Sequence, residues 1–220
     1  NKWGLMTFNG NMRDATHPRD IANGTGILVY DALNPTASEQ RIWSDQWYSI
    51  GGKLKQPVLD VSSTTGAANY NQLISTINGL PANTNTPIPS AYYEAIRYFR
   101  GMAEGTTANS PNTQYTSPIK YRCQKNYIIF VSDGEPTGFP VRYQLGRLMR
   151  QDYILRSDAT LRQAINNGAN GNWDSAYSTA RIAYLAHNWD MMDSGRDAEG
   201  KSFNDATGSP VGQDFSKQTI

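Results

Sequence analysis

The feature that most constrains the fold is an unbroken apolar run, Tyr127-Ile-Ile-Phe-Val131, the most hydrophobic stretch of the chain. A run that is continuous rather than alternating is typical of a strand covered on both faces in a parallel α/β sheet. It leads directly into Ser132-Asp-Gly-Glu-Pro136, whose composition predicts a turn. We therefore expect Val131 to lie at the carboxyl end of a strand, where open α/β sheets bind their ligands.

Further strand and helix patterns precede and follow this run. Strands are expected over Lys2–Phe8, Gly26–Tyr30 and Lys53–Val61, the last at an edge because it contains Pro57. Helices are expected around the apolar stripe Tyr70, Leu73, Ile74 and Ile77, over Ala91–Phe99 with Ser90 as N-cap and Gly101 as stop, near 158–166, and over Ser175–Asp190 with Tyr177, Ala180, Tyr184 and Trp189 on one face.

This alternation predicts the fold class, a doubly wound, mostly parallel α/β sheet flanked by helices. A length of 220 residues suits one domain, 1–220, with long loop insertions near 9–50, 102–118 and 190–216. The formal charge is only +1, which argues against a chain-wide surface for nucleic acid or anionic membranes. No apolar run approaches the roughly 18 residues that span a bilayer, so we expect no membrane insertion. His17, His187 and Cys123 are too few for a Cys/His metal cluster.

Two residues are candidates for binding a metal ion. Asp133 follows the expected strand directly, and Thr86 precedes the helix that begins after Ser90, so both side chains are expected near one crest of the sheet. A hydroxyl and a carboxylate, completed by water, form the oxygen-only ligation that suits Mg²⁺. The alternative for each is a plain turn residue, because Asp133 precedes a glycine and Thr86 precedes Pro87.

Three motifs follow one another along the chain, Trp3-Gly-Leu-Met-Thr-Phe8, Asn85-Thr-Pro-Ile-Pro-Ser-Ala91 and Tyr127-Ile-Ile-Phe-Val-Ser-Asp-Gly134. Their order resembles that of a von Willebrand factor A domain. They match the second strand, the threonine loop and the fourth strand of that family. Ser117-Pro-Ile-Lys-Tyr-Arg-Cys-Gln-Lys-Asn126 and the stretch from Ala180 to Asp205 narrow the resemblance to the type IV pilus tip adhesins of the PilC/PilY family.

The resemblance implies a non-enzymatic adhesion module, exported to the bacterial surface at the pilus tip or outer membrane, with a role in pilus biogenesis and virulence. Its implied partners are a host-surface or extracellular ligand, pilus subunits and the remainder of a parent adhesin. It implies that Thr86 and Asp133 contribute to a Mg²⁺ or Mn²⁺ site. Alternatives are a structural or mechanosensing pilus element without its own ligand, or a hydrolase. The chain contains no Gly-x-Ser-x-Gly elbow, which weakens the last.

One part of the family pattern is missing. A metal-binding A domain has Asp-x-Ser-x-Ser after its first strand, and this motif occurs nowhere in the chain. We expect the chain to be a fragment that lacks the first and last strands, because a sheet without an internal strand leaves backbone groups unpaired. The alternatives are a diverged domain without the ion site, or a permuted site at Asp60-Val-Ser-Ser-Thr64, which otherwise reads as a turn. The carboxylates between Asp190 and Asp205 do not fit an EF-hand and are expected in a solvated loop.

Overall fold

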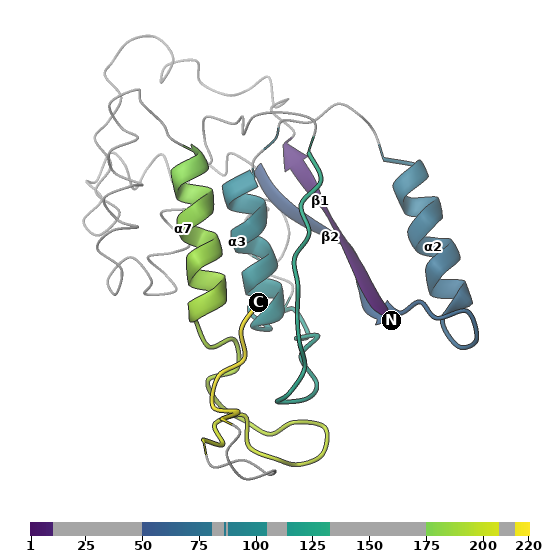
Figure 1. The fold of residues 1–220 in the computed structure, drawn as a ribbon. Helices are drawn as coiled ribbons and strands as arrows, with labels where there is room; N and C mark the ends of the chain where they lie inside the picture. The colour runs from purple at the N-terminus through teal and green to yellow at the C-terminus, as the bar shows by residue number, and fades with distance from the viewer. Residues whose placement is uncertain (11–49, 81–85, 87, 105–113, 133–174, 207–213) are drawn as a thin grey trace, which may run out of the picture.

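In the part of the chain that the structure describes, the sheet is an antiparallel pair of strands (Figure 1). The structure is a computed structural model that describes residues 1–10, 50–80, 86, 88–104, 114–132, 175–206 and 214–220. Strand β1 (Lys2–Gly10) pairs with β2 (Ile50–Asp60), and the register runs from Lys2 opposite Asp60 to Gly10 opposite Ile50. Two segments that the sequence predicts to be extended are thereby confirmed.

Pro57 lies at an irregularity of this ladder. The register shifts there, so that Pro57 and Val58 together face Gly4. Because proline has no N–H to donate, it is accepted in a sheet at a bulge or an edge. Next to Pro57, the N–H of Val58 is donated to a side chain, the hydroxyl of Tyr98 on helix α3 (Ile88–Phe99), at 2.8 Å. Gly4 suits its position because a Cβ there would lie 2.9 Å from the Val58 nitrogen.

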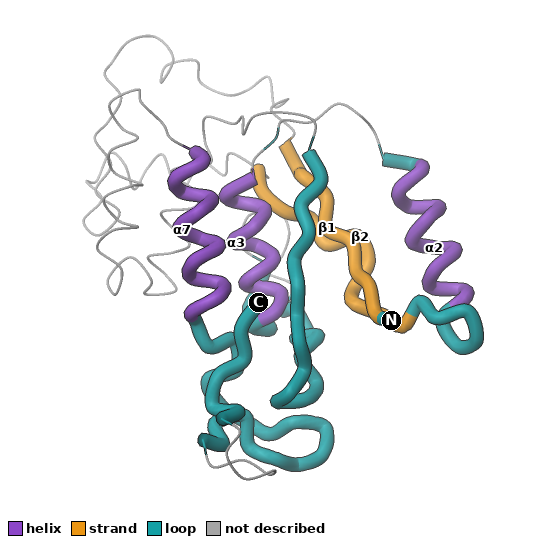
Figure 2. The backbone as a smooth tube through the Cα atoms, in the orientation of Figure 1, coloured by secondary structure: helices purple, strands orange, loops and turns teal. Residues whose placement is uncertain are grey.

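Helix α3 is the centre of the core, with contacts to both strands and to helix α7 (Ser175–Asn188) (Figure 2). Ten of its 12 residues are buried. It approaches β2 closely at Gly52, where a Cβ would lie only 3.1 Å from Cβ of Glu94. Gly52 faces Glu94 and Val58 bonds Tyr98, so β2 and α3 run in the same direction.

The structure corrects the predicted start of α3 and confirms its end. The helix begins at Ile88, so Ser90 lies in its first turn rather than at the N-cap. The Ser90 hydroxyl is buried and makes no hydrogen bond in the described part of the chain. Gly101 ends the helix as predicted, with φ of 66°. The N–H groups of Gly101 and Met102 are donated to the carbonyls of Tyr98 and Arg97, which is the Schellman arrangement.

Helix α7 forms where the sequence predicts it, but it buries a different face. Ile182 and Ala186 are fully buried, whereas Ala180 is exposed and Tyr184 is 54% exposed. The predicted stripe through Ala180 and Tyr184 is therefore wrong. The α7 C-terminus lies beside that of α3, because the Arg100 guanidinium stacks 3.9 Å from the centre of the Trp189 ring.

Two segments expected to be exposed loops contribute to the core. The core cluster contains Tyr93, Ile96, Tyr98 and Phe99 of α3, Ile182 and Ala186 of α7, and Tyr115, Ile119, Met191 and Phe203. Tyr115 belongs to the predicted loop 102–118 and Phe203 to the predicted insertion 190–216. The described parts of both segments are irregular, as predicted. They bury single side chains in the core, while residues 193–196 and 198–201 remain exposed.

The apolar run 127–131 is the largest correction. It continues an extended trace that lies beside α3 in Figure 1, yet it forms no strand and no ladder with the described residues. The alternate side chains Tyr127, Ile129 and Val131 are exposed to solvent, at 74%, 68% and 87%. Ile128 packs against the core, and the Phe130 ring contacts Tyr92 of α3. The prediction that both faces of this run are covered is therefore wrong for the described structure.

Several expectations lie outside the described residues or remain predictions. The expected strand Gly26–Tyr30, the expected helix near 158–166 and Asp133 all fall outside the described ranges. One antiparallel pair of strands with helices α2 (Ala67–Asn78), α3 and α7 is compatible with several α/β arrangements. The doubly wound, mostly parallel sheet thus stays a prediction.

Candidate functional site

The segment 117–132 runs along α3 in the opposite direction. At the C-terminal end of α3, the Ser117 hydroxyl donates a hydrogen bond to the Phe99 carbonyl at 2.6 Å. Near the N-terminal end, the rings of Phe130 and Tyr92 lie 4.8 Å apart. Ser132, at the end of the segment, therefore lies toward the N-terminus of α3.

Thr86 is found at the same end of α3. Its carbonyl accepts the Ile88 N–H at 2.9 Å, which fixes Thr86 directly before the first turn, and the residue is half-buried. Asp133, the second predicted ligand, lies outside the described residues, although its neighbour Ser132 lies within them. Thr86 and Ser132 thus lie toward the same end of α3.

The donor set can be compared with the ion that the family resemblance implies. The Thr86 hydroxyl is a neutral oxygen of the type that Mg²⁺ accepts. One hydroxyl is not a metal site, and within the described ranges no group of three His, Cys, Asp or Glu residues could hold a metal ion. Thr86 is therefore suitable as one ligand among several, and the others would have to come from Asp133, water or residues beyond those described.

The permuted site at Asp60 is not what the structure forms. The Asp60 carboxylate accepts hydrogen bonds from the Thr65 hydroxyl and from the Ser62 N–H and hydroxyl, the latter two at 3.0 Å. These bonds, led by that of Thr65, lower the pKa of Asp60 to about 2. Since β2 runs parallel to α3, Asp60 also lies at the end away from Thr86. The predicted turn is confirmed, and Gly66 closes it.

The carboxylates of 190–205 are engaged within the protein. Asp190 accepts the N–H groups of Met192 and Gln218, Asp193 pairs with Arg100, Asp197 accepts three backbone N–H groups, Glu199 pairs with Lys201, and Asp205 pairs with Arg122. The N–H groups of Glu199 and Lys201 are each donated to the Asp197 carboxylate at 2.9 Å. These contacts anchor the loop. The side chains of Asp193 and Glu199 nevertheless stay 73% and 55% exposed, as expected for a solvated loop, whereas Asp197 is buried, contrary to that expectation.

Arg122 contacts Asp197 and Asp205 of the acidic loop 190–205 and Phe215 of the C-terminal segment. Its side chain is only 5% exposed, pairs with Asp205 and stacks 4.6 Å from the centre of the Phe215 ring. Its N–H is donated to Asp197 at 3.4 Å. Burial of Asp197 opposes its ionisation, but the N–H groups of Lys201, Arg122 and Glu199 outweigh that effect and lower its pKa. The arrangement stabilises structure and offers no reactive group.

The most buried polar pair was missed by sequence reasoning. Glu94 is fully buried in α3, and its Oε1 accepts the Tyr115 hydroxyl at 2.8 Å. Burial, followed by the charge of Glu94, raises the pKa of Tyr115. The sequence places the apolar face of this helix at Tyr92, Ala95, Ile96 and Phe99, without position 94, and Tyr115 falls in a Thr/Asn/Ser-rich stretch. No local signal therefore pointed to this pair.

Two further observations concern the surroundings of the protein. None of the described helices combines the length and the apolar character that crossing a bilayer requires. Cys123, the single cysteine of the chain, is exposed. Compared with known proteins, the chain matches no family model, no curated protein and no solved structure.

Proposed function

We propose that this chain is a non-enzymatic adhesion module of the von Willebrand factor A type, exported and carried at the tip of a bacterial type IV pilus, with a role in pilus biogenesis. One observation carries the proposal. The antiparallel course of 117–132 along α3 brings Thr86 and Ser132, the neighbour of Asp133, to the same end of that helix. That juxtaposition is what a site built from Thr86 and Asp133 requires.

The proposed site would bind Mg²⁺ or Mn²⁺ with few protein charges. Thr86 would contribute its hydroxyl and Asp133 its carboxylate, the latter through water. An ion that is poorly neutralised by the protein attracts a carboxylate of the ligand, which is the chemistry that the metal supplies. The remaining ligands would come from the rest of a parent adhesin.

Exposed aromatic side chains support binding over catalysis. Tyr70, Tyr121, Tyr127 and Tyr184 are between 40% and 74% exposed. Tyrosine is enriched at protein interfaces because it combines a large apolar ring with a hydroxyl that remains solvated. The proposed partners are accordingly host-surface or extracellular ligands and pilus subunits.

Thermal unfolding with Mg²⁺ or Mn²⁺ against EDTA tests the ion site. A ligand at 100-fold over its Kd adds about 2.7 kcal/mol, which raises the midpoint by roughly 2–4 °C per kcal/mol for a domain of this size. Asp133→Ala should abolish the rise, whereas Asp193→Ala, at the other end of α3, should keep it. Equal midpoints with and without metal would contradict an assembled ion site in this chain.

Adhesion itself needs a second experiment. Fluorescent beads coated with the chain are counted on epithelial cell layers in Mg²⁺ and in EDTA. We expect retention that EDTA and Asp133→Ala both reduce. Retention no greater than that of albumin-coated beads would contradict the adhesion proposal, whatever the metal does to stability.

A further inference from the structure

The segment 127–131 has an open backbone edge. Within the part of the chain that the structure describes, no hydrogen bond involves its five residues, whereas the neighbouring Gln124 and Asn126 are bonded to each other at 2.7 Å. An extended segment with unpaired N–H and C=O groups is a template for another strand. Water can satisfy these groups, but water cannot favourably cover the apolar side chains beside them.

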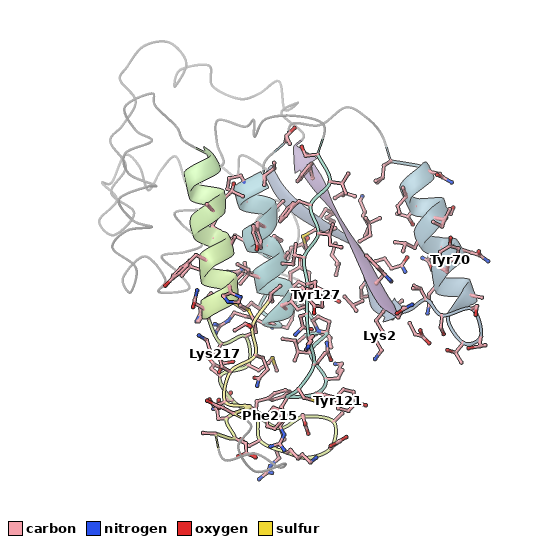
Figure 3. All side chains as sticks on the ribbon, in the orientation of Figure 1. Lys2, Tyr70, Tyr121, Tyr127, Phe215 and Lys217 are labelled. Carbon is pink, nitrogen blue, oxygen red and sulfur yellow. The ribbon has the colours of Figure 1, made fainter. Side chains whose placement is uncertain are left out.

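The side chains along this edge alternate in exposure. Lys125, Tyr127, Ile129 and Val131 are exposed, whereas Asn126 is buried and Ile128 packs on the core. Phe130, between the last two exposed residues, is 37% exposed and its ring contacts that of Tyr92. The alternation has the period of two that an extended strand shows. Tyr127, the first residue of 127–131, is labelled in Figure 3, on the segment that lies beside α3. Segment 127–131 therefore has the side-chain pattern of a β-strand but no paired strand among the described residues.

Charge defines one end of the edge. Between Asn126 and Ser132 the sequence has no charged residue. Lys120 and Lys125 are both exposed next to the start of the edge, where the N–H of Lys120 is donated to Gln124 at 3.0 Å. Neither lysine forms an ion pair within the described ranges. A complementary strand is therefore uncharged and apolar along its middle and acidic at the end beside these lysines.

We propose that the edge 127–131 binds an extended segment of a separate protein by strand addition. That segment supplies a ladder of backbone hydrogen bonds, apolar side chains beside Tyr127, Ile129 and Val131, and a carboxylate beside Lys125. Strand addition takes its affinity from the ladder and its selectivity from alternate side chains. This surface goes beyond the proposed ion site and does not depend on Thr86 or Asp133.

Helix α2 provides an internal comparison. Its exposed side chains Tyr70, Ile74 and Ile77 are 49%, 39% and 43% exposed, so it too presents an apolar surface. Its backbone groups are already paired within the helix. A ligand that only seeks apolar surface would bind both regions, whereas a strand would select 127–131.

The test is amide NMR of the full chain with the blocked peptide Asp-Thr-Val-Thr-Val-Thr-Val-Asp. We expect alternate amides within 127–131 to become protected from hydrogen exchange while the α2 amides stay unchanged. A peptide N-methylated at alternate residues should not bind. Lysine in place of both aspartates should weaken binding about two- to fivefold, the size of a cross-strand charge pair. Ile129→Pro should abolish protection, and Ile129→Thr should retain it.

Four outcomes overturn the proposal. These are no protection at 127–131, equal binding of the N-methylated peptide, equal or tighter binding of the lysine peptide, and equal responses at α2. Two results with the chain alone also decide against a separate partner. Protection that grows with concentration, together with a dimer in sedimentation, assigns the edge to a second copy. Protection that is independent of concentration assigns it to the chain itself.

Discussion

Helices α2 and α3 have the same length of 12 residues and the same kind of apolar periodicity, but their fates differ (Figure 1). In α3 ten residues are buried, whereas α2 has none. Helix α3 packs on both strands and on α7, while α2 packs mainly on β2 among the described elements. The comparison teaches that an amphipathic pattern predicts a helix but does not say whether its apolar face is covered. Matched substitutions in the two regions measure how much this coverage adds to the free energy of unfolding.

The largest difference is expected for isoleucine truncation. Ile96 in α3 is fully buried and Ile74 in α2 is 39% exposed. Ile96→Ala removes packing and leaves a cavity, so it should lower the free energy of unfolding by about 2–5 kcal/mol. Ile74→Ala should cost less than about 1 kcal/mol, as surface substitutions do. Urea unfolding of both variants measures the two costs, and equal costs would mean that α2 is covered in solution.

A smaller effect is expected at the ends of α2. A Cβ at Gly66 would lie 2.3 Å from the Asp60 carbonyl oxygen, whereas the nearest atom to one at Gly79 is 3.5 Å away. Because backbone must move, Gly66→Ala should cost about 1–3 kcal/mol. Gly79→Ala should change stability by less than about 0.5 kcal/mol. Thermal or urea unfolding compares them, and a neutral Gly66→Ala would show that the turn before α2 is adaptable.

The third effect concerns the hydrogen bond from the Tyr115 hydroxyl to the carboxylate of Glu94 on α3. Tyr115→Phe leaves the buried Glu94 with one donor fewer, so it should cost about 1–2 kcal/mol. Tyr70→Phe on α2 serves as the control, because Tyr70 is 49% exposed and water can replace its contacts. Chemical denaturation at neutral pH measures both. A Tyr115→Phe variant as stable as the control would mean that the bond adds nothing to folding.

The smallest effect should be seen only in acid. The folded pKa of Asp60, about 2, lies below its ordinary value near 3.8. Its contribution to stability is therefore complete above that ordinary value and is lost as the pH falls toward 2. Thr65→Ala removes the leading hydrogen bond and should raise the pKa, which NMR titration of the Asp60 carboxyl carbon detects. The neighbouring Thr64→Ala should leave the titration unchanged, and an unchanged titration in both variants would contradict the assignment.

Local patterns predicted the helices well. Apolar spacing placed α2, α3 and α7, and Gly101 marked the end of α3 because a left-handed residue is needed there. β-forming residues likewise placed β1 and β2. The capping rule failed at Ser90, which looks like an N-cap but lies in the first turn of a helix that begins with Ile88-Pro89.

The candidate site was predictable only as a pair of segments. Thr86 and Asp133 were chosen because each stands next to an expected crest of the sheet. That the two segments share one end of α3 depends on contacts between distant residues, Ser117 with Phe99 and Phe130 with Tyr92. No spacing in the sequence encodes such contacts.

By itself, the sequence determined where the described helices and strands form, because hydrogen bonding and side-chain spacing within a few residues decide those elements. Only the tertiary structure decided which apolar surfaces are covered. It buried Tyr115 and Phe203 from segments that look like solvated loops, and it left Tyr127, Ile129 and Val131 bare in the most apolar run of the chain. Burial requires a partner surface, and that partner is contributed by residues far away in the sequence.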